Sequence, residues 1–331
     1  MKLYFKSIAI LLLIMNSFSA HSQDPEFTQF YANPIYLNPA FAGSNGCPRI
    51  NMNYRNQWPN ITGAFVTNTV SYDQYVSAVN GGIAISMMND MAGQNTINWN
   101  SLNIAYSYHL AVNRKFTILM GAQVGWNQKF LDWKKLTFGD QIDPHSGFIY
   151  KTGDQPRSQK LFDNGWGTKG FFDASAGIIG FSKVFYFGVA VKHLNTPDQS
   201  LILSQTPSAL PMRFTAHIGS NIELGGGSKY STSTSLSPNI IYSYQDGFMQ
   251  LNIGMLVKYG AFTTGAWWRE GDAFILSIGM DSGTFKFGYS YDITTSKLTN
   301  GSGGSHELSL GINFNCRKPI KKFRTISCPS F

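Results

Sequence analysis

Hydrophobic and polar residues alternate with a period of two along most of the chain, from about residue 48 to residue 316. In residues 285–291 every second side chain is aromatic, and the side chains between them are lysine, glycine and serine. Residues 307–314 alternate leucine, isoleucine and phenylalanine with glutamate, serine, glycine and asparagine. Because successive side chains of a β-strand point to opposite faces, each segment has one apolar face and one polar or small face. The pattern predicts an all-β protein.

The alternating segments predict fourteen strands. Their expected spans are 48–58, 63–74, 81–91, 99–111, 115–129, 170–181, 184–194, 212–223, 233–244, 248–259, 261–269, 273–281, 284–294 and 305–316. These spans exceed the roughly 5–6 residues usual in globular proteins and match the roughly 9–11 residues of a tilted strand that crosses a membrane. Single-chain bacterial barrels have an even number of strands, as this count does.

Two further features favour a membrane barrel. The polar faces are rich in Gly, Ser, Thr and Asn, which suits a water-filled lumen, and large aromatic residues gather near the expected strand ends. These aromatic residues, which we expect in interfacial girdles, are Trp58, Trp99, Trp126, Tyr259, Trp267 and Trp268. The longest gaps, 130–169 and 195–211, both follow odd-numbered strands and therefore leave from one rim. We predict a transmembrane antiparallel β-barrel whose long loops face outward; a soluble secreted β protein, which also alternates, is the alternative.

Composition agrees with this fold class. Charged residues make up 13% of the chain, about half of what a soluble domain carries, while aromatic residues reach 15%. This balance argues against disorder and against a coiled coil. Five of the eight net positive charges lie in residues 317–331 and two more are Lys2 and Lys6, so the rest of the chain has a net charge of about +1. The basic tail could contact anionic lipid, peptidoglycan or an acidic partner, or remain solvated.

The first residues have the pattern of an export signal. Lys2 and Lys6 precede a short apolar run, 8–15, and small residues follow at Ala20 and Ser22. We predict a signal peptide at 1–22 that is removed on export, an N-terminal motif segment at 23–46, the barrel at 47–316 and the basic tail at 317–331. No other segment has the roughly 18 continuous apolar residues of a membrane helix. The expected location is the outer membrane, where a nucleic acid partner is implausible.

The segment before the barrel combines turn signals with aromatic residues. Asn33-Pro34 and Asn38-Pro39 favour turns, because the residue before a proline is driven out of the helical region. Several aromatic side chains, Phe27 among them, could dock the segment inside or under the barrel. The segment is then a cork or brace, with contact to a partner as a further role. The candidate plug or partner-binding residues are Asp24, Pro25, Phe27, Asn33, Pro34, Asn38, Pro39 and Gly43.

This segment closely resembles the start of the PorP/SprF family of type IX secretion system membrane proteins of Bacteroidota. The resemblance rests on the motif DPEFTQFYANPIYLNPAFAG at 24–43, Cys47-Pro48, NYRNQW at 53–58, GDQIDPHSGFIY at 139–150 and NFNCR at 313–317. It implies an outer-membrane barrel that works with other type IX components in the secretion and surface attachment of large adhesin or gliding proteins through their C-terminal domains. The candidate contacts in the long outer loop are Asp140, Asp143, Phe148 and Tyr150.

Three cysteines remain after the predicted cleavage. Cys47 lies at the start of the first expected strand and Cys316 at the end of the last. Those two strands are neighbours in a closed barrel, so both residues should reach the same rim, and we predict a Cys47–Cys316 disulfide in the oxidising compartment. A Cys47–Cys328 pair and free thiols are the alternatives. An odd count leaves one thiol over, and Cys328 is the expected one.

The sequence contains no recognisable catalytic motif. HExxH, GxSxG and P-loop patterns are absent, and Asp140, Asp143 and His145 lack the fuller pattern of an EF-hand, so we expect no enzyme, cofactor or metal site. The charged or titratable residues expected in the lumen, where they would solvate or rigidify it, are Lys192, His217, Glu223, Lys258, Lys286 and Glu307. Two rival functions remain: a transport channel with the N-terminal segment as hatch, and a structural protein held to peptidoglycan.

Overall fold

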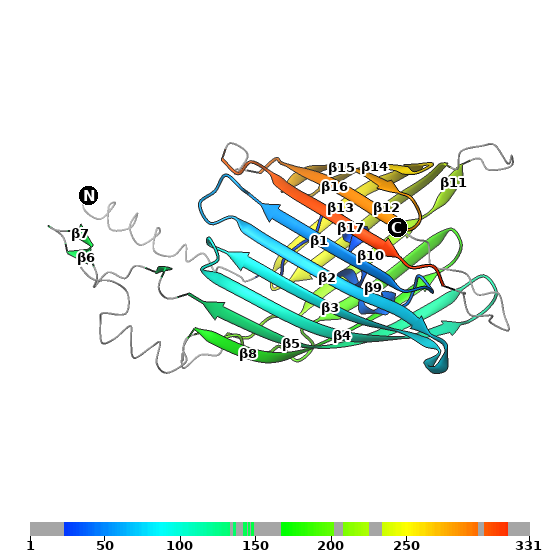
Figure 1. Ribbon diagram of the computed structural model, residues 1–331, viewed down its shortest axis with the longest axis horizontal. Helices are drawn as coiled ribbons and strands as arrows, with labels where there is room; N and C mark the ends of the chain where they lie inside the picture. Colours follow the sequence, from blue (N-terminus) through cyan, green and yellow to red (C-terminus); the bar gives the residue numbers. More distant parts are fainter. Residues whose placement is uncertain are drawn as a thin grey trace, which may run out of the picture.

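The protein folds as a closed, tilted antiparallel β-barrel (Figure 1). The structure is a computed structural model that describes residues 23–132, 135–136, 142–143, 145, 147–148, 167–201, 208–224, 234–296 and 301–316. A continuous ladder runs from β10 (Arg213–Ser220) through β1 (Arg49–Gln57) and β17 (Ser305–Asn313) to β12 (Thr234–Gln245). Pairing of β10 with β12 closes the circle. The predicted antiparallel barrel of fourteen strands is confirmed, with one further short strand.

The barrel strands lie close to the predicted spans. They are β1 (Arg49–Gln57), β2 (Phe65–Val76), β3 (Gly81–Ala92), β4 (Ile97–Ala111), β5 (Thr117–Leu131), β8 (Thr168–Phe181), β9 (Phe185–Lys192), β10 (Arg213–Ser220), β11 (Ile222–Leu224), β12 (Thr234–Gln245), β13 (Phe248–Tyr259), β14 (Phe262–Arg269), β15 (Ala273–Asp281), β16 (Phe285–Thr294) and β17 (Ser305–Asn313). The span 212–223, predicted as one strand, is broken at Asn221 into β10 and β11. Both pieces pair with β12, so the break does not open the barrel.

The two rims of the barrel differ. At the disulfide rim, where β1 begins and β17 ends, Cys47 and Cys316 are joined by a disulfide with a Cα–Cα distance of 5.6 Å. The loop rim at the opposite end carries both long connections, which follow β5 and β9. A short hairpin of β6 (Ile142–Asp143) and β7 (Gly147–Phe148) lies in the first of them.

Side chains alternate across the barrel as the period-two pattern requires. Along β5, Met120, Val124 and Trp126 are exposed on the outer face, whereas the adjacent Leu119 and Asn127 are buried in the lumen. Two residues assigned to the aromatic girdles were predicted wrongly, because Trp99 and Trp267 are only 6% and 2% exposed and point inward. Each fills space in the lumen and donates its indole N–H to an inward asparagine, at 3.0 Å and 2.8 Å respectively.

The N-terminal segment, residues 23–46, is folded into the lumen as a plug (Figure 1). It contains three single-turn elements: η1 (Phe30–Ala32), α2 (Pro34–Leu37) and η2 (Pro39–Phe41). Pro34 and Pro39 each occupy the first position of a turn, where the missing N–H costs nothing. Within the described part of the chain, no helix has the length and apolar character needed to cross a membrane.

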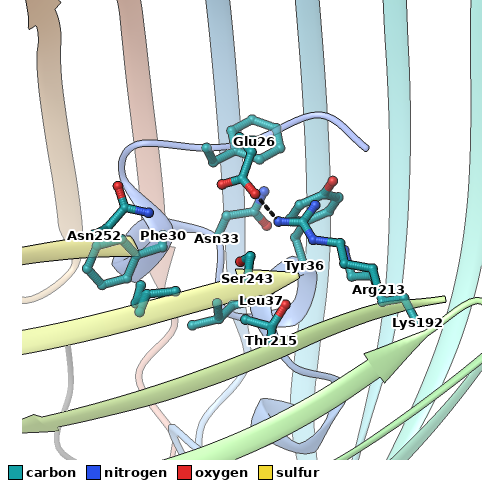
Figure 2. Close-up of a pocket in the computed structure, with 12 residues that line it drawn as sticks. Glu26, Phe30, Asn33, Tyr36, Leu37, Lys192, Arg213, Thr215, Ser243 and Asn252 are labelled. Carbon is teal, nitrogen blue, oxygen red and sulfur yellow. Dashed lines mark hydrogen bonds and ion pairs between the residues drawn. The ribbon is translucent and has the colours of Figure 1, made fainter. Parts of the chain in front are cut away.

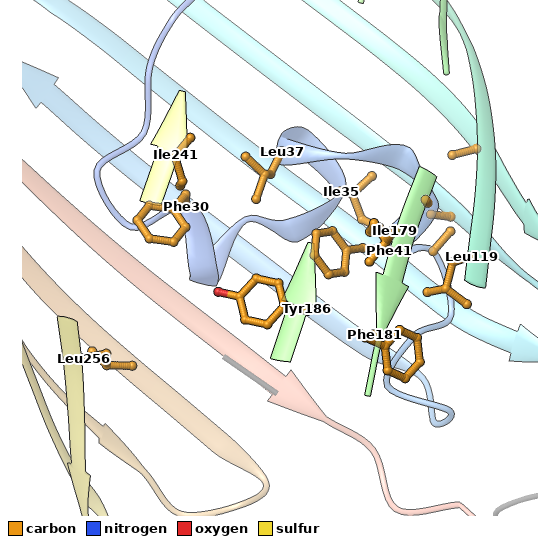
Figure 3. Packing of buried hydrophobic residues seen from close by; sticks show 14 of the residues in the cluster. Phe30, Ile35, Leu37, Phe41, Leu119, Ile179, Phe181, Tyr186, Ile241 and Leu256 are labelled. Atoms are coloured by element: carbon orange, nitrogen blue, oxygen red, sulfur yellow. The ribbon is translucent and has the colours of Figure 1, made fainter. Parts of the chain in front are cut away.

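Apolar side chains of the plug pack against inward residues of the barrel (Figure 3). Ile35 and Phe41 are 2% exposed and join a cluster that includes Leu119 and Ile179 from the barrel wall. This contact requires a wall residue without a side chain where the plug backbone approaches it. A Cβ on Gly121 of β5 would lie 2.3 Å from the backbone nitrogen of Ala40, so only glycine allows the observed approach.

We therefore expect Gly121→Ala to displace the plug, because the added methyl group meets backbone and not a flexible side chain. Overpacking of this kind costs about 1–3 kcal/mol. Faster hydrogen exchange in residues 23–46, with an intact barrel on a heat-modifiability gel, is the expected result. Gly311→Ala is the matched control, since its new Cβ would have its nearest neighbour at 3.3 Å. Equal exchange in both variants would contradict the steric argument.

A second prediction concerns the rim. We expect peptide mapping under non-reducing conditions to recover Cys47 linked to Cys316, with Cys328 available to an alkylating reagent. Cys328 itself lies outside the described residues. The double variant Cys47→Ser with Cys316→Ser should still close its barrel, because the β1–β17 ladder remains, but unfold about 2–4 kcal/mol more easily. Alkylation of Cys47 in the native, unreduced protein would disprove the pairing.

Candidate functional site

The plug crosses the lumen from the loop rim towards the disulfide rim. Asp24 lies beside His193 and Gln245, which adjoin the loop-rim ends of β9 and β12. Gly43 lies at the other end, next to Gly82 near the start of β3, and its positive φ of 66° suits glycine. The motif residues between these two ends are therefore enclosed by the barrel, as expected of a cork or brace.

The loop-rim end of the plug is held by an ion pair between its first described residues and the wall. The Asp24 carboxylate lies 2.8 Å from Nε2 of His193, whose Nδ1 lies 3.0 Å from the carboxylate of Asp173 on β8. The backbone N–H of Asp24 donates to the Gln245 side chain at 3.0 Å. All of these groups are buried, so the interaction is little screened by solvent.

Two further cationic side chains of the wall, Arg213 and Lys192, contact the plug next to this ion pair (Figure 2). Arg213 of β10 forms an ion pair with Glu26 of the plug, and the two face each other in the lumen. Lys192 of β9 places its ammonium 3.3 Å from the centre of the Tyr36 ring, a cation–π contact in a desolvated position. The Tyr36 hydroxyl donates to the carbonyl oxygen of Pro25 at 2.5 Å, which folds the start of the plug back onto α2.

His193 and Asp24 both lie outside the barrel strands, and their surroundings shift the pKa of each side chain. Burial alone would lower the pKa of His193, but the charges of Asp24 and Asp173 and their hydrogen bonds raise it to about 9. Burial would raise the pKa of Asp24, yet His193 and Arg213 hold it well below its usual range. Both partners are therefore charged at neutral pH.

The centre of the plug is held by two carboxylates of the wall. Glu307 of β17 accepts the backbone N–H of Thr28 at 2.7 Å and that of Gln29 at 3.0 Å. Asp292 of β16 accepts the Thr28 hydroxyl at 2.8 Å. Gln29, fully buried, also donates to the Glu307 carbonyl at 3.0 Å and accepts from Ser309 at 2.6 Å. Backbone and side-chain donors of the plug thus complete the coordination of buried anions.

Two arginines balance these carboxylates. Arg55 of β1 lies 2.9 Å from Asp292 and 3.2 Å from Glu307, and Arg269 of β14 lies 3.0 Å from Asp292. Both guanidinium groups also donate to the Thr28 hydroxyl oxygen. The four charges cancel, as buried ions must for the fold to tolerate them. Removing one partner from such a group costs about 3–5 kcal/mol.

Towards the disulfide rim, neutral hydrogen bonds fix the second half of the motif. Asn38, fully buried, accepts the Ala40 N–H at 2.9 Å and donates to the Val189 carbonyl of β9 at 3.2 Å. The N–H of Gly43 donates to Asp73 of β2 at 2.8 Å. Each Asn-Pro pair therefore caps or orients a turn while its amide reaches the wall.

The plug does not fill the whole lumen. A cavity of about 590 Å³ remains at the disulfide rim, on the side of β11 to β17. Tyr31 of the plug forms part of its lining, together with polar side chains of the wall that include Lys258, Lys286 and Glu223. Lys258 is paired with Asp281 at 2.6 Å. The residual space is polar, in agreement with the expected character of the lumen.

The structure brings the predicted motif residues together and separates them from the loop candidates. Asp24, Phe27, Asn33, Pro34, Asn38, Pro39 and Gly43 are buried in the lumen, and Pro25 is half-buried there. Asp143 and Phe148 belong to the β6–β7 hairpin of the long connection, whereas Asp140 and Tyr150 lie outside the described residues. Of the expected lumen charges, Lys192, His217 and Glu307 are buried, and the other three line the cavity.

Sequence reasoning missed most of the wall residues that hold the plug. Arg55, Arg269 and Asp292 are charged side chains at inward strand positions, and that placement was the available signal. Asp173 of β8 had the same signal, but His193 did not, because it follows the end of β9. Among the described residues, no group of three or more His, Cys, Asp or Glu side chains is arranged to hold a metal ion.

Fold and site together define a transmembrane β-barrel whose lumen is occupied by its own N-terminal segment. The chain belongs to the family of type IX secretion system membrane proteins PorP/SprF, which it matches over residues 19–312. The resemblance noted in the sequence is therefore confirmed, and the protein is a membrane component of that secretion system.

Several solved structures are similar to this chain at low sequence identity. The P. putida toluene transporter TodX gives a TM-score of 0.46 at 7% identity, covering 85% of this chain and 93% of that one. The monoaromatic hydrocarbon channel CymD gives 0.44 at 11%, covering 86% and 93%. The Acinetobacter baumannii outer membrane protein Omp33 gives 0.42 at 7%, covering 82% and 100%. A search among the sequences of curated proteins found no match.

The His193 contact predicts a pH dependence for release of the plug. Because the pKa of His193 rises from 6.5 to about 9 in the folded state, its contribution is complete below about pH 6.5 and is lost as the pH rises through about 9. Asp24 contributes above its ordinary value of 3.8, so no change is expected between that pH and 6.5. Hydrogen exchange in residues 23–31, corrected for intrinsic pH effects, should therefore accelerate between about pH 6.5 and pH 9 and show no further His193-dependent change above pH 9.

His193→Gln is the control for this measurement. Glutamine keeps a hydrogen-bonding side chain but does not titrate, so the variant should release its plug more readily at pH 6 and show no change between about pH 6.5 and pH 9. A step of equal size in the variant would assign the pH dependence to another group.

Proposed function

We propose that this protein is a non-enzymatic outer-membrane component of the type IX secretion system that supports secretion and surface attachment of large adhesin or gliding-type proteins. It would recognise their C-terminal domains. The observation that supports this role best is the anchored plug. A lumen occupied by a buried, charge-paired segment suits a protein that holds cargo at its rim better than one that conducts it.

In this proposal the loop rim faces the cell surface and provides the contact with cargo. Both long connections leave from that rim, and the β6–β7 hairpin in the first of them includes Asp143 and Phe148. Asp140 and Tyr150, outside the described residues, belong to the same proposed contact. The disulfide rim and the basic tail at 317–331 would face the periplasm and its secretion components, and outer-membrane lipid would surround the apolar face.

The orientation implies an order of assembly. Removal of residues 1–22 after Sec-type export would leave Gln23 as the first residue, next to Asp24 inside the barrel. The buried position of Asp24 then requires that the plug is enclosed while the barrel closes, or enters it afterwards from the periplasm. In either case the plug sequence is constrained by the wall, so the motif residues act first as a brace.

A transport channel for small molecules, with the plug as a hatch, is the second candidate. The cavity of about 590 Å³ at the disulfide rim favours it, because a ligand of moderate size fits there beneath Tyr31. The charged and polar lining, which includes Lys258 and Lys286, suits a polar solute better than a hydrophobic one.

Measuring cargo display in cells that lack the chromosomal gene distinguishes the two functions. Cells complemented with Asp143→Ala and Phe148→Ala together should make normal amounts of folded barrel but retain at least about fivefold less cargo on their surface, as expected when interactions of about 1 kcal/mol are lost. Surface immunolabelling and the amount of cargo in the medium are the measurements.

Asn38→Ala tests the plug in the same cells. It removes the contacts with Ala40 and Val189, so the plug should loosen in a folded barrel and cargo display should fall. Normal display with a solute flux that rises in liposome swelling assays would instead support the hatch of a channel. Normal display by both variants would contradict the proposed contact surface.

A further inference from the structure

Four amide side chains form a continuous row across the outer face of the barrel. Asn68 of β2 is paired with Asn89 of β3, Asn89 with Asn100 of β4, and Asn100 with Gln128 of β5. Each lies three residues from the loop-rim end of its strand. The alternation of side chains directs all four outward, because their neighbours Trp99, Ser101 and Asn127 in β4 and β5 are buried in the lumen. We call these residues the amide row.

Some side chains of the amide row are hydrogen-bonded to neighbouring amides, and others have free donors and acceptors. The Asn89 amide donates to the side-chain oxygens of Asn98 and Asn100, both at 2.8 Å. The side chains of Asn68 and Gln128 have no hydrogen-bond partner among the residues that the structure describes. Amides supply both donors and acceptors, and leaving them unpaired against hydrocarbon is costly. Their natural neighbour is a molecule rich in hydroxyl groups.

An aromatic surface ends the row on the β8 side. Gln128 is paired with Gly170, and the Trp126 ring covers that glycine so closely that a Cβ there would lie 2.4 Å from it. Trp126 is 45% exposed and packs edge to face against Phe172, which is 71% exposed, with ring centres 4.7 Å apart. Exposed rings beside amides provide a flat apolar face next to hydrogen-bonding groups.

A hollow of about 490 Å³ continues the surface at the loop rim. It is lined by residues 59–64, by Gln94 and Asn95, and by Val66 and Met91, which lie two residues from Asn68 and Asn89. All of its lining residues are uncharged, and its polar ones are Asn60, Thr62, Gln94 and Asn95. The nearby Lys135 ammonium is bound to the carbonyl oxygens of Gln94 and Asn95, at 2.8 Å and 3.3 Å.

The surface is local to this side of the barrel. Near the loop rim, outward positions of β13, β15 and β16 carry apolar residues such as Leu251, Phe274 and Ile293. Next to the amide row, further from the rim, the outward residues are Val70, Met87, Leu102 and Trp126, all strongly exposed. A ligand that spans both layers must therefore have acyl chains and a neutral polar head.

We propose that the amide row, Trp126, Phe172 and the adjoining hollow bind the uncharged sugars of a glycolipid in the outer leaflet. Sugar hydroxyls match the donors and acceptors of the amides, the C–H face of a sugar ring matches the Trp126 ring, and the acyl chains lie along the apolar positions below. The leaflet assignment rests on the proposed placement of the loop rim at the cell surface; the recognition of sugar does not.

The test uses the full-length protein in lipid nanodiscs and three probes: lipopolysaccharide with a complete core oligosaccharide, phosphatidylethanolamine, and soluble maltoheptaose. Native mass spectrometry and competition with a fluorescent lipopolysaccharide measure retention. We expect selective retention of lipopolysaccharide, and at least about tenfold weaker retention by the variant N68L/N89L/N100L/Q128L, as expected for the loss of two or more ordinary hydrogen bonds. Trp126→Ala should weaken retention in the same direction.

Thr264→Leu is the matched control, because it adds the same apolar group to an outward position of β14 on the opposite side. If the fourfold variant does not fold, N100L/Q128L replaces it and should lose retention in the same sense. Equal retention of lipopolysaccharide by wild type and a folded variant, or no preference over phosphatidylethanolamine, overturns the proposal. Binding of maltoheptaose as tight as that of lipopolysaccharide overturns the glycolipid in favour of a free polysaccharide. None of these outcomes depends on cargo display, so the proposed function can fail separately.

Discussion

The pairing of buried charges between plug and wall is the constraint on which the rest of the structure depends. Arg55 and Arg269 cannot remain charged in the lumen without Asp292 and Glu307, and these carboxylates take further donors from Thr28 and Gln29 of the plug. Removing the plug would leave the Glu307 carboxylate without two backbone N–H groups. The empty barrel therefore needs either water or another ligand at that position. A plug held in this way is part of the folded barrel.

The same residues lie where the barrel closes. Arg55 and Glu307 are direct cross-strand partners of β1 and β17, the first and last strands of the circle. The disulfide between Cys47 and Cys316 lies at one end of that pair of strands, and the ion pair lies towards the other. Closure brings together ends of the chain more than two hundred residues apart, and loop-closure entropy opposes it. A covalent bond, an ion pair and the docked plug all act on this one seam.

The fold was predictable because it depends on a local signal, the alternation along each strand, and on the circular order that adjacent hairpins impose. The errors arose where two residues of the same type face different surroundings: Trp126 and Trp99 look alike in sequence, but register turns one outward and the other inward. Much of the site depends on long-range contacts such as Asp24 with His193, which periodicity does not encode. The Arg55–Glu307 pair could have been predicted from the sequence. Counting equal numbers of residues along β1 from Cys47 and along β17 from Cys316 leads to this pair within one residue.

Alternation also explains how one set of strands can serve two purposes. In β2, Thr69 points inward and accepts the Asn33 amide at 2.9 Å, while the adjacent Asn68 points outward in the amide row. In β5, Gly121 faces the plug backbone and Gln128 faces the outer surface. Because the two faces share strands but not side chains, substitutions on one face leave the contacts of the other in place. The two faces are coupled only through the backbone of the strands that they share. A displaced plug should therefore affect the amide row by shifting strand register or twist, and should not remove a contact of the row.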